Sequence, residues 1–277
     1  MKFKTIFVIF NIVIIFSFLF IFFMPLILLG SEHFSGFFRQ NWFIVALFVA
    51  TMAVFNTYFL KNWTLFNLLE REDWTALIDY LEDRIYQKGQ LRKSSVKILL
   101  NAYLVTSRTS EIGRLRSYVS ERKPSLVGEF AIQFGIPYLI ENRPEESERY
   151  FGKLLAESRI KERNWVRWNH AFSLMQLKQF DAAKQEFLTL IDTTRNPIVQ
   201  LLSVYMMNSF PKVQVEEKTL MEEKIAALKG RYSQQEMSDR VEKAKGNVQV
   251  LIFSKVIKDA MDWIYRHNPT SKNVTIH

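Results

Sequence analysis

The sequence predicts an all-α protein, in which two transmembrane helices precede a domain built from helices. Two long apolar runs near the N-terminus carry no charge, and almost every later segment spaces its apolar residues as one helix face does. Glycine and proline, which often end helices, number only 9 and 7 in 277 residues. No segment convincingly alternates apolar and polar residues as a half-buried strand does, so no sheet is expected.

Residues 1–60 are expected to form a two-span transmembrane hairpin. The runs Thr5–Leu29 and Trp42–Leu60 hold 25 and 19 residues. As helices they measure about 37 Å and about 28 Å, against a hydrocarbon core of roughly 30 Å. A cleaved signal peptide, the alternative for the first run, has a shorter apolar core and a small-residue cleavage site, which this run does not show. The absence of cysteine excludes a lipoprotein anchor.

Basic residues near the ends of the two runs predict their orientation. Lys2 and Lys4 precede the first run, and Lys61 and Arg71 follow the second, whereas the connection Gly30–Asn41 holds one arginine and one glutamate. Such a bias favours the cytoplasmic side for the basic ends. The chain is therefore expected to be a multi-pass protein of the cell membrane, with its N-terminus and its large C-terminal domain in the cytoplasm.

The excess positive charge of the chain, +9 overall, is concentrated soon after the second run. Residues 61–83 carry two basic and six acidic side chains, whereas residues 84–123 carry ten basic and two acidic ones. A basic side chain near an anionic leaflet contributes about 1 kcal/mol of binding. A candidate face for anionic lipid is therefore formed by Arg84, Lys88, Arg92, Lys93 and Lys97. The alternative is a solvated helix face with the ordinary basic bias of a cytoplasmic segment.

Two similar segments follow one another within residues 128–197. The first reads Ala131-x-x-Phe134-Gly135-x-x-Tyr138 and then Ser147-x-x-x-Phe151-x-x-Leu154, and the second reads His170-Ala171-x-x-Leu174 and then Ala183-x-x-x-Phe187-x-x-Leu190. Phe151 and Phe187 are separated by 36 positions, close to a period of about 34. The pattern resembles the tetratricopeptide repeat (TPR), a pair of helices that cross closely at small residues.

The resemblance implies a TPR-like α-solenoid over residues 61–212, clearest over 128–197, that binds partner proteins. A non-repetitive helical bundle is the alternative. Residues 213–266 are expected to cover the last apolar face of the array as capping helices, with a capping box at Ser233-Gln-Gln-Glu236 and a last helix that begins after Asn247. Its apolar face would be Val248, Leu251, Ile252, Val256, Ile257, Ala260, Met261 and Ile264. Residues 267–277 are expected to be a flexible tail.

The resemblance also implies a groove along the first helix of each pair. Some TPR proteins grip a C-terminal carboxylate there with lysine, asparagine and arginine, but the corresponding positions here are mostly apolar. The candidate partner groove is formed by Ile132, Ile136, Trp165, Trp168 and Phe172. Such a groove would suit an amphipathic helix of a partner, or the C-terminal helix of this chain.

No residue pattern in the sequence indicates a catalytic reaction. The sequence lacks the glycine-rich phosphate loops and the nucleophile motif of hydrolases, and its four histidines are scattered without carboxylates at metal-ligand spacing. We therefore expect no enzyme activity, no cofactor and no metal. The basic and aromatic residues between Arg159 and Trp168 favour a helix with one buried face; an acidic peptide ligand is the next alternative, and nucleic acid is the least favoured.

The function expected from the sequence is a membrane-anchored, TPR-like scaffold that binds or positions partner proteins at the membrane. The alternative is a structural subunit of a multi-protein membrane machine for secretion, motility or envelope assembly. In that case Thr51, Asn56 and Thr57 would form hydrogen bonds with partner spans. An enzyme whose site has no familiar motif is the third possibility.

Overall fold

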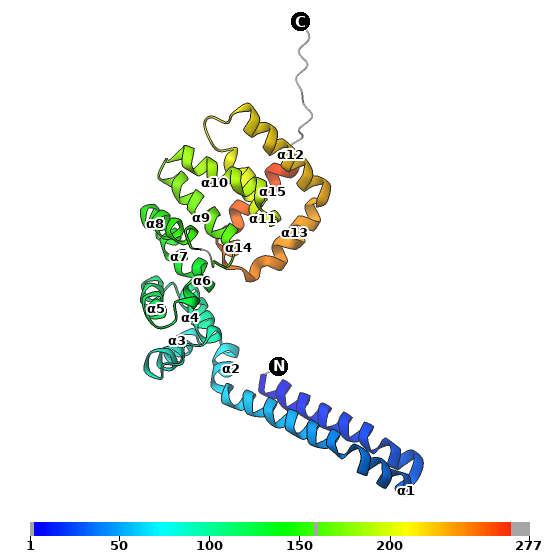
Figure 1. Cartoon of the computed structure of the whole chain (residues 1–277). Coiled ribbons are helices and arrows are strands. Elements are labelled where there is room, and N and C mark those ends of the chain that lie inside the picture. Colours follow the sequence, from blue (N-terminus) through cyan, green and yellow to red (C-terminus); the bar gives the residue numbers. More distant parts are fainter. Residues whose placement is uncertain (1–2, 158–159, 267–277) are drawn as a thin grey trace. The chain divides into compact units, whose positions relative to one another are not determined.

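The protein is all-α, as the sequence predicts. The computed structural model describes residues 3–157 and 160–266, and no strand occurs in that part of the chain. Two compact units are present, Met1–Ser107 and Arg108–His277 (Figure 1). This division falls inside the predicted 61–212 domain, and the boundaries at residues 60 and 212 stay predictions.

The first unit begins with the helical hairpin α1 (Phe3–Lys61), which reverses at Gly30. Gly30 has φ 80° and ψ 175°, a conformation that glycine adopts without strain. The two apolar arms are Lys4–Leu28 and Phe34–Lys61. The second arm thus begins earlier than the predicted Trp42, because one glycine reverses the chain and the polar residues before Trp42 continue the helix. The expected loop Gly30–Asn41 is a tight turn instead.

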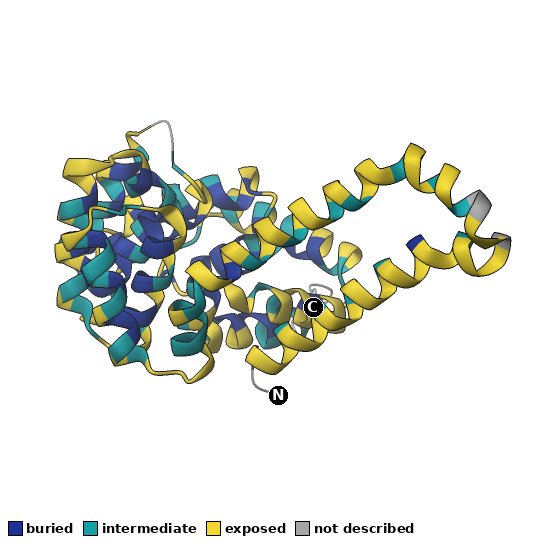
Figure 2. Ribbon diagram, turned by 90° about the horizontal axis from the view of Figure 1, so that it is seen from below, coloured by how far each residue is buried: buried dark blue, intermediate teal, exposed yellow. Residues whose placement is uncertain are grey.

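The two arms pack against each other through pairs of side chains along their length. Near the open end, Asn56 Nδ2 donates a hydrogen bond to Asn11 Oδ1 at 3.0 Å. The ring of Phe7 stacks on Phe59 with centroids 3.7 Å apart. Most other apolar side chains of the hairpin point outward, so that only 6% of the most apolar window of each arm is buried (Figure 2).

Shorter helices complete the first unit. They are α2 (Trp63–Glu70), α3 (Trp74–Glu82), the π-helical turn η1 (Asp83–Gln87) and α4 (Lys93–Val105). Helix α3 starts at Asp73, whose carboxylate accepts a hydrogen bond from the Ala76 amide at 3.1 Å. Tyr103 on α4 donates a hydrogen bond to Glu82 on α3 at 2.5 Å, and burial raises the pKa of this phenol. Helices α3 and α4 share a core that includes Leu77, Leu81, Val96 and Leu99, all 0% exposed.

The second unit consists of eleven α-helices and one 3-10 turn within its described residues. They are α5 (Thr109–Arg122), α6 (Ser125–Glu129), α7 (Ala131–Ile140), α8 (Pro144–Leu155), α9 (Arg163–Gln176), α10 (Phe180–Thr193), α11 (Pro197–Met207), α12 (Val215–Arg231), α13 (Gln234–Lys243), η2 (Ala244–Gly246), α14 (Val248–Ile252) and α15 (Ser254–Arg266). From α7 to α11 each helix packs on the next one along the chain. Their shared core includes Phe134, Phe151, Trp168 and Phe187.

Small residues lie where the helices of the second unit approach most closely. A Cβ built on Gly135 of α7 would lie 2.7 Å from Tyr150 Cε1 and 2.8 Å from Phe151 Cε1 of α8. Between α8 and α9, the buried Ser173 hydroxyl donates to the Ser147 hydroxyl at 2.7 Å. The contact at Gly135 is the close crossing within one helix pair that the sequence pattern predicts, whereas the Ser147–Ser173 bond joins neighbouring pairs. The regular superhelix of a repeat array stays a prediction.

The predicted last helix differs from the expectation, and the role of residues 213–266 as caps of a repeat array stays a prediction. The capping box at Ser233 is present, and Asn247 caps a helix by accepting a hydrogen bond from the Gln249 amide at 2.9 Å. That helix, however, ends at Ile252, and α15 follows as a separate helix because Phe253 leaves helical geometry. The break turns Leu251, which was expected on the apolar face, outward to 53% exposure. The predicted tail 267–277 lies outside the described residues.

The crossing at Gly135 gives a direct stability prediction. Gly135→Ala should lower the free energy of unfolding of the second unit by about 1–3 kcal/mol, because the new methyl group overlaps two aromatic rings of α8. Gly113→Ala is the matched control, since a Cβ at this glycine of α5 meets nothing within 4 Å. The control should gain up to about 1 kcal/mol from better helix propensity. Urea unfolding of both full-length variants, followed by tryptophan fluorescence, measures the difference; equal midpoints would contradict the tight crossing.

Candidate functional site

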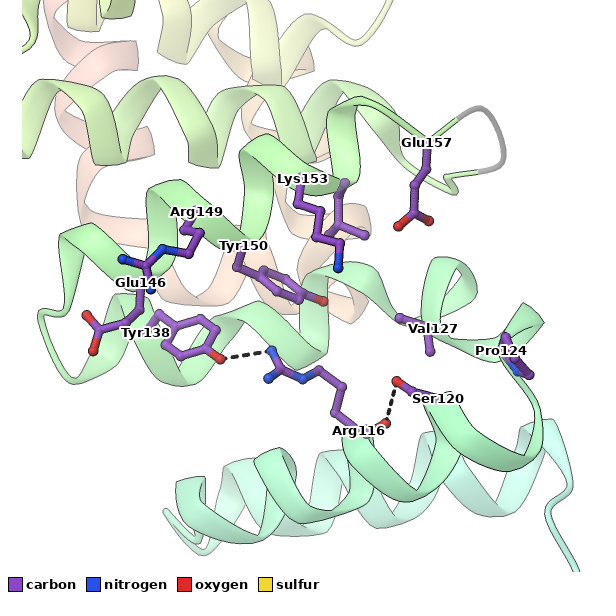
Figure 3. Close-up of a pocket in the computed structure, with 11 residues that line it drawn as sticks. Arg116, Ser120, Pro124, Val127, Tyr138, Glu146, Arg149, Tyr150, Lys153 and Glu157 are labelled. Atoms are coloured by element: carbon purple, nitrogen blue, oxygen red, sulfur yellow. Dashed lines mark hydrogen bonds between the residues drawn. The ribbon is translucent and has the colours of Figure 1, made fainter.

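A cavity of the second unit lies between α5, α6, α7 and α8 and has a volume of about 490 Å³. Three basic side chains and two tyrosines line it together with carboxylates and small apolar groups. The lining residues are Arg116, Ser120, Pro124, Val127, Tyr138, Glu146, Arg149, Tyr150, Lys153, Leu154 and Glu157. Figure 3 shows Arg116 reaching from α5 towards the tyrosines of α7 and α8. We refer to these residues as the arginine–tyrosine pocket.

Arg116 is held in place by the two tyrosine rings. Its Nη1 donates a hydrogen bond to the Tyr138 hydroxyl at 2.8 Å (Figure 3). The guanidinium carbon lies 5.7 Å from the ring centroid of Tyr138 and 5.2 Å from that of Tyr150, within the range of cation–π attraction. A guanidinium carries five N–H donors. Four of them remain beyond the bond to Tyr138, so this arginine is oriented and still able to bind a ligand.

Tyr150 is the fixed wall of the pocket. Its hydroxyl donates a hydrogen bond to the Ala131 carbonyl at 2.8 Å. Its ring lies against Gly135, where a side chain would prevent the approach. Burial raises the pKa of Tyr150, so the phenol stays protonated and remains a donor at neutral pH. Gly135 therefore sets the position of a pocket residue as well as the packing of α7 on α8.

The charges of the pocket are not balanced. Arg149 and Lys153 lie four residues apart on α8, both exposed. Among the residues that the structure describes, neither these two nor Arg116 forms a salt bridge. Glu146 is engaged by Arg143, whose Nη2 lies 2.6 Å from its Oε1, and this bond holds the pKa of Glu146 below its usual range. Chemically, the pocket offers an anion several cationic donors beside aromatic and aliphatic surfaces.

The groove residues predicted from the sequence are largely covered by the chain itself. Ile132, Ile136, Trp165 and Trp168 are at most 3% exposed, and Phe172 is half-buried. Phe253 lies between α14 and α15. Its ring centroid is 4.6 Å from that of Trp168 and 5.5 Å from that of Phe172. Phe253 thus lies against two of the five predicted groove residues, and the groove as a partner-binding site stays a prediction.

The five residues of the predicted lipid face differ in their surroundings. Arg84 donates to Gln90 at 2.9 Å and to the Tyr80 hydroxyl at 3.1 Å, and Lys88 pairs with Asp83. Lys93 also has an interaction partner. Arg92 and Lys97 are exposed. Contact with anionic lipid stays a prediction, and local hydrogen bonds and ion pairs already occupy part of this face.

The structure also brings together a histidine and two carboxylates that the sequence does not pair. His170 on α9 lies between two carboxylates: its Nε2 is 3.5 Å from Glu148 Oε1 on α8, and its Nδ1 is 3.5 Å from Glu186 Oε1 on α10. Its interaction with Glu186, together with the charge of Arg167, holds the pKa of Glu186 below its usual range. Within the described residues, no group of three histidine, cysteine, aspartate or glutamate side chains is arranged to hold a metal ion. The cluster brings together side chains of three helices.

Sequence reasoning did not identify the arginine–tyrosine pocket. Arg116 belonged to the basic stretch 84–123, and Tyr138 belonged to the repeat pattern, so each residue had a separate explanation. Arg149 and Lys153 were not singled out in the sequence. Only the spacing of these two, four residues apart on α8, and the packing of α7 on both α8 and α5 could have indicated one site.

Fold and pocket together define a class: an all-α chain with an apolar N-terminal hairpin and a cationic, tyrosine-walled pocket in its second unit. The chain belongs to the family described as "Uncharacterised Treponema protein", whose model matches residues 111–266. That range begins within α5 and ends with α15, so it includes the whole pocket.

A protein of Treponema pallidum (strain Nichols), itself described as uncharacterized, is similar to this chain. The two are 24% identical over 231 residues, which cover 79% of this chain and 74% of the relative. No solved structure matches. The family description does not mention tetratricopeptide repeats, so that resemblance stays a prediction.

The position of Phe253 gives a prediction for the covered groove. Phe253→Ala should cost about 3–5 kcal/mol of folding free energy, because it removes a ring that is 6% exposed and packs on Trp168. Leu251→Ala, at a neighbouring exposed position, should cost almost nothing. Urea unfolding measures the cost, and acrylamide quenching of tryptophan fluorescence should increase for Phe253→Ala only. Unchanged quenching would show that Phe253 does not cover the tryptophan.

Proposed function

We propose that this protein is a membrane-anchored helical scaffold that holds a partner protein at the membrane through its second unit. One observation carries the proposal: the hairpin exposes its apolar side chains along both arms, each long enough to cross a bilayer, and buries only 6% of their most apolar windows. Apolar surface of this extent is strongly disfavoured in water, at roughly 25 cal/mol per Å². Lipid is the environment that suits it.

The contacts between the two arms support an anchor that is retained. Asn11 of the first arm bonds to Asn56 of the second, and Phe7 and Phe18 stack on Phe59 and Phe48. An amide pair is favourable inside a bilayer, where water does not compete for its hydrogen bond. A signal peptide that is removed has no reason to be matched in this way to the following helix.

The finer features of the scaffold are part of the same proposal. The N-terminus and the second unit lie in the cytoplasm, as the basic residues around the apolar arms indicate. The paired helices of the second unit belong to a TPR-like array, and α12 to α15 cover its end. The close crossing at Gly135 and the packing of Phe253 on Trp168 support this arrangement. The arginine–tyrosine pocket is the place on this unit where a partner binds.

A cavity in the hairpin favours the second candidate function, a structural subunit of a membrane machine. It has a volume of about 430 Å³ and is lined by Ile15, Phe18, Leu19, Val45, Phe48, Val49, Met52, Ala53 and Asn56. A span of a partner protein could fill it. The two N–H groups of the Asn56 amide donate to Asn11 Oδ1 and to the Met52 carbonyl, and the Thr51 hydroxyl donates to the Leu47 carbonyl, so neither residue has a donor left for that partner. A stable stoichiometric complex in mild detergent would favour this second candidate.

The orientation can be measured by cysteine labelling, because the natural chain contains no cysteine. Ser31→Cys, beside the turn of the hairpin, should react with a membrane-impermeant maleimide in intact bacterial spheroplasts. Ser238→Cys, exposed on α13, should react only after the membrane is permeabilised. The opposite pattern would reverse the orientation, and extraction of the protein by sodium carbonate would contradict an integral anchor.

Partner binding can be tested by photo-crosslinking in native membranes. A benzophenone amino acid at Ser120, which lines the pocket, should form adducts with a protein that mass spectrometry can identify. The same amino acid at Ser238, exposed on α13 and outside the pocket, is the control and should not form these adducts. No adducts at Ser120, or the same adducts at both positions, would contradict a scaffold that binds at this pocket.

A further inference from the structure

The arginine–tyrosine pocket has more positive charge than its own residues neutralise. Arg116, Arg149 and Lys153 face it without a salt bridge to any described residue. Of the two carboxylates in the lining, Glu146 is bonded to Arg143, which lies outside the lining, at 2.6 Å and 3.0 Å. Glu157, beyond the C-terminal end of α8, is the other carboxylate, so the lining holds two carboxylates against three cations. Such a surface attracts an anionic ligand.

The ligand-binding groups are positioned before any ligand arrives. Arg116 lies against two rings and bonds to Tyr138, while Tyr150 is fixed by the Ala131 carbonyl and by Gly135. Tyr138 is held further by Arg143, whose guanidinium lies 5.4 Å from its ring centroid. Because these side chains are already ordered, binding loses less conformational entropy.

The remaining lining indicates what the anion carries with it. Pro124, Val127 and Leu154 provide aliphatic surface beside the two tyrosine rings. A volume of about 490 Å³ accommodates several side chains rather than a single small ion. Glu146 and Glu157 would repel a compact dianion such as phosphate, whereas carboxylates spaced along a chain can avoid them. A peptide with acidic and apolar residues matches all three features.

We propose that the arginine–tyrosine pocket binds an acidic, partly apolar peptide segment of a partner protein. The guanidinium of Arg116 and the cations of Arg149 and Lys153 bind its carboxylates, and the tyrosine rings with Val127 and Leu154 pack on its apolar side chains. The inference rests on the proposed scaffold function and specifies the chemistry that the scaffold recognises.

A peptide library tests this recognition directly. Phage displaying random dodecapeptides are selected on the full chain in nanodiscs of neutral lipid, and the selected peptides are synthesised for fluorescence anisotropy. We expect enrichment of aspartate and glutamate next to apolar residues. Replacing the acids of a selected peptide by their amides should weaken binding by at least about tenfold, because charge-assisted hydrogen bonds are lost. Selection without acidic enrichment overturns the proposal.

Matched variants assign the binding to the pocket. Arg149→Gln with Lys153→Gln removes two exposed cations of α8 and should leave the fold intact while reducing affinity by at least about tenfold. Lys255→Gln with Lys258→Gln removes the same charge from exposed positions of α15 and should leave affinity unchanged. Arg116→Gln should weaken binding, whereas Arg114→Gln on the same helix should not. Equal losses in both double variants would mean that binding follows only the overall charge.

Other anions are included as outcomes that contradict the proposal. Displacement of the peptide by millimolar inorganic phosphate would indicate a small-anion site. Binding of the protein to phosphatidylglycerol vesicles, lost in the α8 double variant, would indicate that the pocket binds a lipid headgroup. Failure of the peptide class can be distinguished from failure of the scaffold function by the photo-crosslinks at Ser120. Protein adducts at Ser120, without enrichment of acidic peptides in the library, would support the scaffold function and contradict the acidic-peptide ligand.

Discussion

The crossing of α7 and α8 at Gly135 is the contact on which the organisation of the pocket depends. Without a side chain at this position, Tyr150 and Phe151 come closer to α7 than any other residue would permit. Phe151 then enters the core, while Tyr150 reaches the Ala131 carbonyl and turns its ring towards Arg116. The close approach of α7 and α8 thus packs Phe151 into the core and positions Tyr150 in the arginine–tyrosine pocket.

The second organising contact of this unit involves its C-terminal end. Phe253 interrupts what would otherwise be one helix and places its ring on Trp168 and Phe172. The segment after residue 247 is therefore part of the core of the unit. The family match, which continues to residue 266, is consistent with this role. The arginine–tyrosine pocket lies instead between α5, α6, α7 and α8.

The sequence predicts much of the fold because its strongest signals are local. The absence of charge in each apolar run, the helical spacing of apolar residues and the capping box at Ser233 each lie within one continuous segment of the chain. The single-residue turn at Gly30 and the break at Phe253 were not predicted. Both depend on contacts between segments: the matched arms of the hairpin in the first case, and the tryptophan of α9 in the second. The pocket was missed for the same reason, since Arg116, Tyr138 and Tyr150 come from three helices.

The turn at Gly30 has a consequence for the biogenesis of an anchor of this kind. A connection of one non-helical residue is too short to leave one arm in the bilayer while the other waits in the aqueous channel of the insertion machinery. If the hairpin is the membrane anchor proposed above, the two arms enter lipid together, as one preformed element. Asn11 and Asn56 would then already satisfy each other when they leave water, and neither amide would cross the interface alone. Lengthening the connection would separate these events, and the polar pair would become an obstacle to insertion.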